Sequence, residues 1–484
     1  MYKKELQYRC NLVHQRMSYT PANNATNRKI VCLGAGYVGG PTMAVIAKHN
    51  PNIDVYVLDL NVSRISQWQT GVPFYEPGLD TVVDTCRNRN LFFSCNVEKH
   101  LRDADIIFLS VNTPTKMYGT GMGSASDVSY FEAAAYMIAK MVRKPEVIIV
   151  EKSTVPLQTA EAIDTIFRHN MHPSVKYSIL SNPEFLAEGT AVADLENPDR
   201  VLIGGENAQA IETLVNIYAA WVPKERILTT NTWSSELSKL VANAMLAQRV
   251  SSINAISAIC EKTGADIKEV SRCIGMDTRI GSKFLQPSVG FGGSCFHKDI
   301  LNLVYIADTM GLPEVANYWR TVVTMNEWNK TRFAINVYKA MNRNLKNKKI
   351  VVLGFAFKAN TSDTRETPAI HVCKYFMKEQ ANLHIYDPKV TKESIVEDLS
   401  LHNDEYSHHN SSVTIHDNLS GNIFTGAHAV CVLTDWREFA DISTWNDIYE
   451  SMIKPAHIFD GRYFLDHKHL TNIGFQVHCI GKKM

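Results

Sequence analysis

The chain has 484 residues, 45% of them hydrophobic, which suits a globular protein of about three domains. Fifty lysines and arginines balance 49 aspartates and glutamates, and the formal charge of +1 excludes a global field that attracts nucleic acid or an anionic membrane. No apolar run approaches the roughly 18 residues that span a bilayer, and the opening segment has no apolar signal core.

The opening segment, residues 1–28, is basic and poor in acids, a composition that a mitochondrial transit peptide shares. We favour a polar N-terminal extension and a cytoplasmic protein. From Lys29 to about Thr230, β-branched runs alternate with helix-like stretches and predict a doubly wound parallel sheet. The expected strands are KIVCL, DVYVLDL, ADIIFLSV, EVIIVEKS, YSILS, RVLIGG and RILTT.

A glycine-rich turn follows the first of these strands. In KIVCLGAGYVGGP, the glycines Gly34, Gly36 and Gly39 stand where a dinucleotide-binding loop needs a tight turn, close backbone approach to a pyrophosphate and close helix packing. The next strand leads to Asp59, whose carboxylate is placed to bind ribose hydroxyls and repel a 2′-phosphate, so we expect NAD rather than NADP. Arg64 either softens that preference or is a solvated helix residue.

Small polar residues follow three later strands, at residues 112–115, 153–155 and 182–184. Ordinary turn chemistry explains one such loop. Three of them at the carboxyl edge of one sheet favour a shared ligand site.

The stretch at residues 233–264 contains no proline and ends at Gly264, which predicts one long helix between domains. Lys239 and Asn243, four residues apart, share a face of it. A lysine beside an apolar seam is usually a surface residue with an extended side chain. If this face lines a cleft instead, Lys239 stabilises a developing alkoxide and Asn243 orients substrate.

The segment FLQPSVGFGGSCFHKDILNL carries the densest chemical signal. Gly290, Gly292 and Gly293 lead to Cys295 at an expected helix start, where backbone N–H groups and the helix dipole stabilise a thiolate nucleophile. Asp299, four residues on, shares the helix face. The alternative is a buried structural cysteine in a glycine-rich turn.

Near Lys348 the strand pattern returns with KKIVVLGFAF, ANLHIYD, AHAVCVLT and HIFDG, which predicts a second α/β domain. The fold class is therefore two Rossmann-like doubly wound domains joined by a long central helix and a helical domain. We expect domains at residues 29–232, 233–345 and 346–484.

Ten cysteines are scattered from Cys10 to Cys479 without a CxxC pair, which predicts reduced thiols. Cys32 and Cys431 lie in apolar runs and are expected to be buried. The paired histidines lack ligand partners at metal spacing, so we expect surface positions and no metal. They are His169 with His172 and His467 with His469.

Motifs throughout the chain carry a family resemblance. In order they are GAGYVGGP, YEPGL, SVNTPT, EKSTVP, NPEFLAEG, SELSKLVAN, GFGGSCFHKD, LGFAFKANTSDTRE and YDP. From about Lys29 to the end, this ordered set resembles the UDP-glucose/GDP-mannose dehydrogenase family. The resemblance implies an NAD-binding first domain, a central dimerisation domain and a UDP-sugar-binding last domain.

The resemblance also implies a four-electron, NAD-dependent oxidation of UDP-glucose to UDP-glucuronate. Cys295 captures the aldehyde as a thiohemiacetal, a thioester follows, and water releases the acid, with two NAD used per turnover. It further implies a homo-oligomer, a dimer at least and in animal members a hexamer, in which Arg279 reaches a neighbouring subunit's site.

Family roles fall on matching positions of this sequence. Lys239 stabilises the substrate oxygen or shuttles its proton; Asp299, Thr154 and Glu184 order water and relay protons; Asn243 holds the sugar. The implied NAD contacts are Gly34, Gly36, Tyr37, Val38, Gly39, Asp59, Arg64, Asn112, Thr113, Thr115, Lys116, Ser153, Thr154, Glu188 and Arg365. The implied substrate contacts are Glu184, Phe185, Leu186, Glu188, Lys239, Asn243, Arg279, Gln286, Ser288, Phe291, Gly292, Phe357, Lys358 and Arg462.

Three alternatives stay open. A sister dehydrogenase acting on GDP-mannose or a UDP-N-acetylhexosamine shares the cysteine chemistry and differs in sugar contacts. A nonenzymatic NAD sensor keeps the fold without needing the lysine, cysteine and aspartate. A hydroxyacid dehydrogenase needs one hydride transfer and no nucleophilic cysteine.

Overall fold

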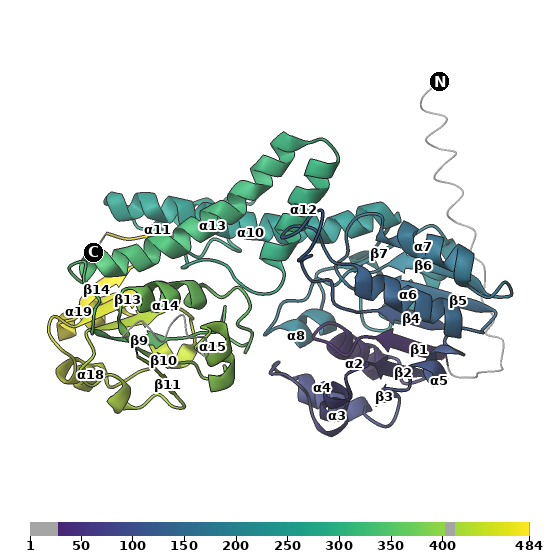
Figure 1. Cartoon of the computed structure of the whole chain (residues 1–484), viewed down its shortest axis with the longest axis horizontal. Helices are drawn as coiled ribbons and strands as arrows, with labels where there is room; N and C mark the ends of the chain where they lie inside the picture. The colour runs from purple at the N-terminus through teal and green to yellow at the C-terminus, as the bar shows by residue number, and fades with distance from the viewer. Residues whose placement is uncertain (1–27, 402–411, 484) are drawn as a thin grey trace.

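The computed structural model describes residues 28–401 and 412–483, so residues 1–27 of the predicted extension lie outside the described residues. Two α/β domains stand at opposite ends of the molecule, and long helices connect them (Figure 1). The predicted fold class is confirmed by this arrangement.

The first domain is built on a sheet of order β3-β2-β1-β4-β5-β6-β7-β8, with apolar clusters on both faces under its helices. The strand order reverses between β1 and β4, and ligands bind open α/β sheets at such switch points. Its strands are β1 (Arg28–Leu33), β2 (Ile53–Leu58), β3 (Leu91–Ser94), β4 (Ile106–Leu109), β5 (Glu146–Glu151), β6 (Lys176–Ser181), β7 (Val201–Gly205) and β8 (Ile227–Thr230). Its α-helices are α2 (Gly39–His49), α3 (Val62–Thr70), α4 (Leu79–Cys86), α5 (Val97–Leu101), α6 (Ser129–Met141), α7 (Thr159–Asn170), α8 (Ala191–Glu196) and α9 (Ala208–Tyr218).

The predicted parallel sheet contains one antiparallel pair of strands. Strands β6 and β7 pair antiparallel, whereas the other pairs of this sheet in the described residues are parallel. The connection between β6 and β7 contains the polar segment 182–190 and then only the six-residue helix α8. This connection brings β7 back beside β6 in the opposite direction.

Four central helices connect the domains: α10 (Thr232–Lys262), α11 (Ile267–Gly275), α12 (Phe296–Thr309) and α13 (Pro313–Ala340). The predicted long helix corresponds to α10, whose start is capped by the Asn231 side chain accepting from the N–H of Ser234. Helix α10 packs on β6 and β7 of the first domain, and α13 packs on α14 (Pro368–Lys378) of the second. These two helices therefore carry contacts from one domain to the other.

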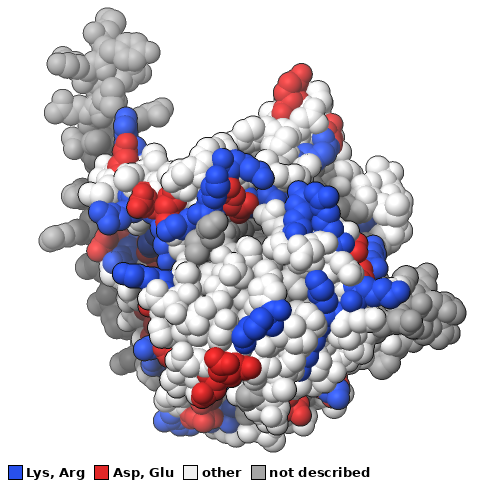
Figure 2. Space-filling model, turned by 90° about the vertical axis from the view of Figure 1, so that its left-hand side faces the viewer, with Lys and Arg blue, Asp and Glu red and all other residues white. Residues whose placement is uncertain are grey.

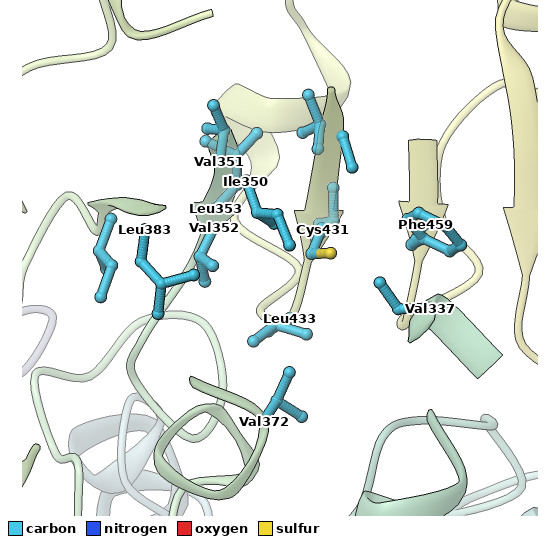
Figure 3. Close-up of a cluster of buried hydrophobic side chains, with 14 of the residues drawn as sticks. Val337, Ile350, Val351, Val352, Leu353, Val372, Leu383, Cys431, Leu433 and Phe459 are labelled. Carbon is cyan, nitrogen blue, oxygen red and sulfur yellow. The ribbon is translucent and has the colours of Figure 1, made fainter. Parts of the chain in front are cut away.

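The last domain has a parallel sheet of order β11-β10-β9-β12-β13-β14, which also reverses, here between β9 and β12. Its strands are β9 (Lys349–Leu353), β10 (Asn382–Tyr386), β11 (Val413–His416), β12 (Ala429–Val432), β13 (His457–Asp460) and β14 (Gln476–Cys479). Its other helices are α15 (Lys392–Asp398), α17 (Arg437–Ala440), α18 (Trp445–Ser451) and α19 (His467–Ile473). Val372 of α14 and Val337 of α13 belong to the same buried cluster as strand residues Leu353, Cys431 and Phe459 (Figure 3).

The distribution of surface charge and the state of the cysteines agree with what the composition predicts. At the C-terminal-domain end, lysine and arginine side chains form separate groups among acidic and uncharged surface rather than one continuous basic stripe (Figure 2). Among the described residues, all nine cysteines are free, and Cys32 and Cys431 are buried as predicted. No helix in the described part of the chain is long and apolar enough to cross a membrane.

Candidate active site

The glycine loop lies between β1 and α2, beside the switch point of the first sheet. A side chain at Gly34, whose φ is +107°, would place its Cβ 2.1 Å from the carbonyl oxygen of Ser110. A Cβ at Gly39 would lie 2.1 Å from the carbonyl oxygen of Gly34, whereas a Cβ at Gly36 would meet nothing within 4 Å. The two tight glycines thus shape the turn, and the open one leaves backbone accessible to a pyrophosphate.

Asp59 follows β2 and holds the glycine loop. Its carboxylate oxygens accept from the N–H of Ala35 at 2.9 Å and from the N–H of Asn61 at 2.9 Å. Arg64 lies partly buried in the first turn of α3. A dinucleotide fits this cradle, because a carboxylate stands at the strand end and a helix begins at the open glycine turn.

The remaining residues of the loop face the neighbouring segments. Val38 is the N-cap of α2. The hydroxyl of Tyr37 binds the carboxylate of Glu76, which also accepts from the N–H of Gly189 at 2.7 Å and from the N–H of Ala191 at 2.7 Å. Glu76 is buried and therefore ties the glycine loop to the segment after β6.

The polar loops after β4, β5 and β6 are brought together as the sequence predicts. Ser153 Oγ donates to the carbonyl oxygen of Val111 at 2.6 Å, and Thr113 Oγ1 donates to that of Thr154 at 2.8 Å. The N–H of Asn182 donates to the carbonyl oxygen of Glu151 at 2.8 Å. The loop after β4 also carries Asn112, which is exposed, and Thr115 and Lys116, which are partly buried.

A buried ion pair joins the long helix to the loop after β6. Lys239 Nζ of α10 lies 2.9 Å from Glu184 Oε1, and both residues are almost fully buried. Burial opposes the charged ammonium, but the negative charge of Glu184 and its neighbours outweighs it and raises the pKa of Lys239. The surface position considered for Lys239 is therefore wrong, and its face of α10 looks inward.

Cys295 is the N-cap residue of α12, and Asp299 lies in the first turn of that helix with its N–H bonded to the carbonyl oxygen of Cys295 at 2.9 Å. The buried carboxylate of Asp299 accepts from Asn243 Nδ2 at 2.6 Å and from Lys298 Nζ at 2.7 Å. The two pairs that the sequence predicts are Lys239 with Asn243 on α10 and Cys295 with Asp299 on α12. They therefore meet in one buried cluster.

The expectation that the helix start favours a thiolate is wrong for this structure. Burial first, and then the negative charge of Asp299, raise the pKa of Cys295, while Lys239 acts in the lowering direction. The side chain is therefore a thiol at neutral pH. A partner that takes its proton is needed before the sulfur attacks.

The glycine segment before Cys295 rests on the last domain. A Cβ at Gly292 would lie 2.6 Å from the carbonyl oxygen of Glu366, and a Cβ at Gly293 would lie 2.9 Å from the Phe357 ring. The N–H of Gly293 donates to the carbonyl oxygen of Arg365 at 2.8 Å. Larger side chains would push this segment off the domain.

Glu188 links the first and last domains. It accepts from Thr361 Oγ1 at 3.1 Å and pairs with Arg365 at 3.3 Å, while Arg365 also pairs with Asp363 at 2.7 Å. Burial first, and then the nearby charge of Asp363, raise the pKa of Glu188 to about 8. Two expected ligand contacts, Glu188 and Arg365, are thus bound to each other in this structure.

The other expected substrate residues lie at three places. Phe185 and Leu186 follow Glu184, and the N–H of Leu186 donates to Glu184 Oε2 at 2.9 Å. In the last domain, Arg462 pairs with Asp435 at 2.8 Å, and its carbonyl oxygen accepts from Gln286 at 3.2 Å. Three further expected positions are Ser288, Phe291 and Lys358. The N–H groups of Ser288 and Phe291 bond Asn254 and Asn326, and Lys358 is partly buried and follows Phe357.

Arg279 stands apart from this cluster. Its side chain is 87% exposed and pairs with Asp277, two residues earlier, at 2.6 Å.

Sequence reasoning missed several supporting residues. Lys298 shares the carboxylate of Asp299, Asn326 of α13 holds Phe291 at both its N–H and its carbonyl oxygen, and Glu76 holds the glycine loop. The segment YEPGL signalled Glu76 as part of a motif, but its contact across more than a hundred residues has no local signal. For Lys298, its adjacency to Asp299 was a local clue.

The predicted surface position is wrong for His467, whose Nε2 lies 2.8 Å from Oδ2 of buried Asp460. With Cys479 these side chains bring ligand-type atoms within 4.8 Å of one another. However, Asp460 already accepts from the N–H of Leu465 at 2.9 Å, and burial raises the pKa of the Cys479 thiol. The group therefore anchors a loop by hydrogen bonds. Exposed as predicted are His169, His172 and His469.

Comparison with known proteins matches the three parts of the chain. The NAD binding domain of the UDP-glucose/GDP-mannose dehydrogenase family matches residues 28–222, its central domain matches 233–328 and its UDP binding domain matches 351–467.

Curated relatives match over nearly the whole length. UDP-glucose 6-dehydrogenase 1 of Glycine max is 56% identical over 470 residues, 94% of this chain and 97% of that protein. UDP-glucose 6-dehydrogenase of Drosophila melanogaster is 55% identical over 462 residues, 94% of this chain and 96% of that protein. A solved UDP-glucose dehydrogenase from Pyrobaculum islandicum has a TM-score of 0.80 at 27% identity, covering 96% of this chain and 100% of its own. This chain belongs to the UDP-glucose/GDP-mannose dehydrogenase family.

Proposed function

We propose that this protein oxidises UDP-glucose to UDP-glucuronate with NAD, using Cys295 as a covalent nucleophile. The observation that carries the proposal is the buried cluster in which Lys239, Asn243 and Asp299 surround the start of the cysteine helix. The names of relatives at 55–56% identity support the substrate. A hydroxyacid dehydrogenase or an NAD sensor has no use for a cysteine in this setting.

The first step removes two electrons from the primary alcohol. The hydroxyl passes its proton to the relay of Glu184, Asp299 and Thr154, and a hydride leaves carbon 6, so the aldehyde forms. Lys239, held charged by Glu184, stabilises the negative oxygen. Asn243 orients the sugar through the side chain that also bonds Asp299. The glycine loop, Asp59 and the loops after β4 and β5 would hold NAD, which would supply the hydride acceptor for both oxidations, two molecules per turnover.

The next steps take place on sulfur. The acid–base groups beside Cys295 take its proton, the sulfur adds to the aldehyde carbon, and a proton passes to the oxygen, giving a thiohemiacetal. Loss of a second hydride and of the hydroxyl proton leaves a thioester. Water ordered by Glu184, Asp299 and Thr154 then adds to the thioester, the carbon–sulfur bond breaks, and the carboxylic acid and the thiol are released.

The mechanism is tested by mass spectrometry of the intact protein mixed with UDP-glucose and NAD. We expect a sugar adduct on the peptide that contains Cys295. Free aldehyde accumulating while this thiol stays unmodified would contradict the covalent route. Turnover assays with UDP-glucose, GDP-mannose and UDP-N-acetylhexosamines decide among sister activities, and a preference for either of the last two contradicts the substrate proposed here.

We also propose that a second subunit completes the site. Arg279 is 87% exposed and pairs only locally, with Asp277, in the described residues, so its side chain is available to a neighbour. Exposed apolar side chains on α10 and α13 support subunit contact at the central helices, with the hexamer as the larger expected assembly. They are Met245, Ile256, Ile259, Tyr318 and Trp328. The free cysteines of the described residues support a cytoplasmic location.

A further inference from the structure

Two buried carboxyl groups that have no role in the proposed reaction meet beside the loop that carries Thr154. Glu151 ends β5 and is 1% exposed, and Glu236 lies on α10 and is 2% exposed. No N–H or O–H group of the described chain donates to either oxygen of Glu151. The group that Glu151 meets is the carboxyl of Glu236.

Glu236 has the donors that Glu151 lacks. Its Oε2 accepts from the N–H of Gln158 at 2.9 Å, and its Oε1 accepts from the N–H of Ala160 at 3.1 Å. These N–H groups form the start of α7, where the helix dipole also favours a negative charge. An ionised Glu236 is therefore well supported.

Two ionised carboxylates cannot share such a buried place, so one of them keeps a proton. Burial first, and then the charge of Glu236, raise the pKa of Glu151 well above its usual value. Glu161 of α7 adds further negative charge near Glu236. The neighbouring ammonium of Lys152 is bonded elsewhere, to Asn182 and Tyr218. The proton therefore resides on Glu151.

The position of this pair connects it to the reaction. The loop at residues 152–158, which carries Thr154, begins directly after Glu151 and ends at Gln158. Both ends of the loop thus meet Glu236. On α10, Glu236 lies three residues before Lys239, one helical turn away.

We propose that Glu151 stays protonated and donates this hydrogen to Glu236, and that the pair is a positioning device holding the Thr154 loop against the helix that carries Lys239. The role in turnover rests on the proposed function. The shared proton does not, because it follows from burial and contacts alone.

Infrared spectroscopy tests the proton directly. At neutral pH the unmodified protein is expected to show protonated-carboxyl absorption that shifts in D₂O. Glu188, whose pKa is raised to about 8, contributes to it as well, so the expected change in Glu151→Gln is the loss of one component, the Glu151 band. The control is Glu146→Gln, at the exposed other end of β5, which is expected to keep the band. A spectrum without the band, or one that Glu151→Gln leaves unchanged, overturns the proposal whether or not UDP-glucose is the substrate.

Kinetics test the positioning role. Glu151→Gln keeps an N–H donor for Glu236, so we expect kcat within about threefold of the parent. Glu151→Leu keeps the side-chain volume but has no donor, and Glu236→Gln removes the charge. In both variants kcat is expected to fall about tenfold or more. KM for UDP-glucose and KM for NAD are expected to stay within about twofold of the parent values. Equal losses in Glu151→Gln and Glu151→Leu, or none in Glu151→Leu, overturn the role, and this comparison stands even if Glu236→Gln fails to fold.

Discussion

Asn243 donates from Nδ2 to Oδ2 of Asp299 at 2.6 Å, and this buried hydrogen bond joins the long helix α10 to the helix that begins at Cys295. Lys239 lies one turn before Asn243, and Cys295 lies one turn before Asp299. The bond therefore fixes the ammonium and the thiol relative to each other, although they belong to different helices.

Replacing the nucleophile should separate binding from turnover. We expect Cys295→Ser to lower sustained turnover by about 10³-fold or more, because the alcohol is a far weaker nucleophile here, while nucleotide affinity by calorimetry changes little. Cys273→Ser, at an exposed cysteine of α11, is the control and should behave as the parent. Full activity in Cys295→Ser would rule out the covalent route.

The raised pKa of Cys295 predicts a pH-dependent reactivity. Because burial and Asp299 keep the thiol protonated, its alkylation by iodoacetamide should be slow at neutral pH and accelerate as pH rises. Asp299→Asn removes one negative charge, so the midpoint of this rise should move down by about one pH unit. Asp308→Asn, at the exposed far end of α12, should leave the midpoint unchanged. A midpoint that moves upward in Asp299→Asn contradicts the electrostatic assignment.

Breaking the Lys239–Glu184 pair should affect both stability and rate. Lys239→Ala leaves a buried carboxylate without its cation, and we expect a loss of about 3–5 kcal/mol in denaturant unfolding together with loss of turnover. The double variant Lys239→Met with Glu184→Gln should regain most of the stability but not the activity. Lys48→Ala, in a surface pair with Glu196, should cost no more than about 1 kcal/mol. Equal costs for the two lysines would refute the burial argument.

Cofactor preference should depend on Asp59. Asp59→Asn keeps the size but removes the charge expected to repel a 2′-phosphate, so KM for NAD should rise about tenfold and the preference over NADP should narrow. Steady-state assays with both cofactors measure this. Asp54→Asn, on the same strand β2, is the control. An unchanged NAD/NADP ratio in Asp59→Asn would reject the ribose assignment.

The neighbour role of Arg279 predicts complementation between inactive variants. Arg279→Ala and Cys295→Ser are each expected to lack turnover, but hybrids formed by mixing and reassociating them should contain a site with both groups intact. Activity should return to about a quarter of the parent's if subunits mix at random in dimers. No recovery, with hybrids demonstrated by native mass spectrometry, would place Arg279 in its own subunit's site.

Much of the fold was predictable because its signals are local. Alternating β-branched runs predicted two α/β domains, and a stretch without proline at 233–264 predicted the helix found at Thr232–Lys262. The strands β3, β11 and β14 were missed. Each has only four residues, and polar or histidine side chains interrupt the last two, so pairing with neighbours rather than composition makes them strands.

The site was less predictable wherever it depends on contacts distant in sequence. The spacing of Lys239 with Asn243 and of Cys295 with Asp299 predicted two faces, but not the hydrogen bond between them. The thiol's protonation was mispredicted because a helix start is visible in sequence and burial beside Asp299 is not. The pairing of Glu188 with Arg365 joins residues 177 positions apart, which no local pattern indicates.

The glycines before Cys295 rest on the backbone at Arg365 and on the ring of Phe357, so the segment leading to the proposed nucleophile is supported by the C-terminal lobe. That lobe is the part of the chain matched by the UDP binding domain. A tilt of this lobe would therefore move the UDP binding domain and the backbone before Cys295 together. Larger side chains at Gly292 or Gly293 would therefore be expected to leave nucleotide binding intact while displacing the Cys295 sulfur from its position.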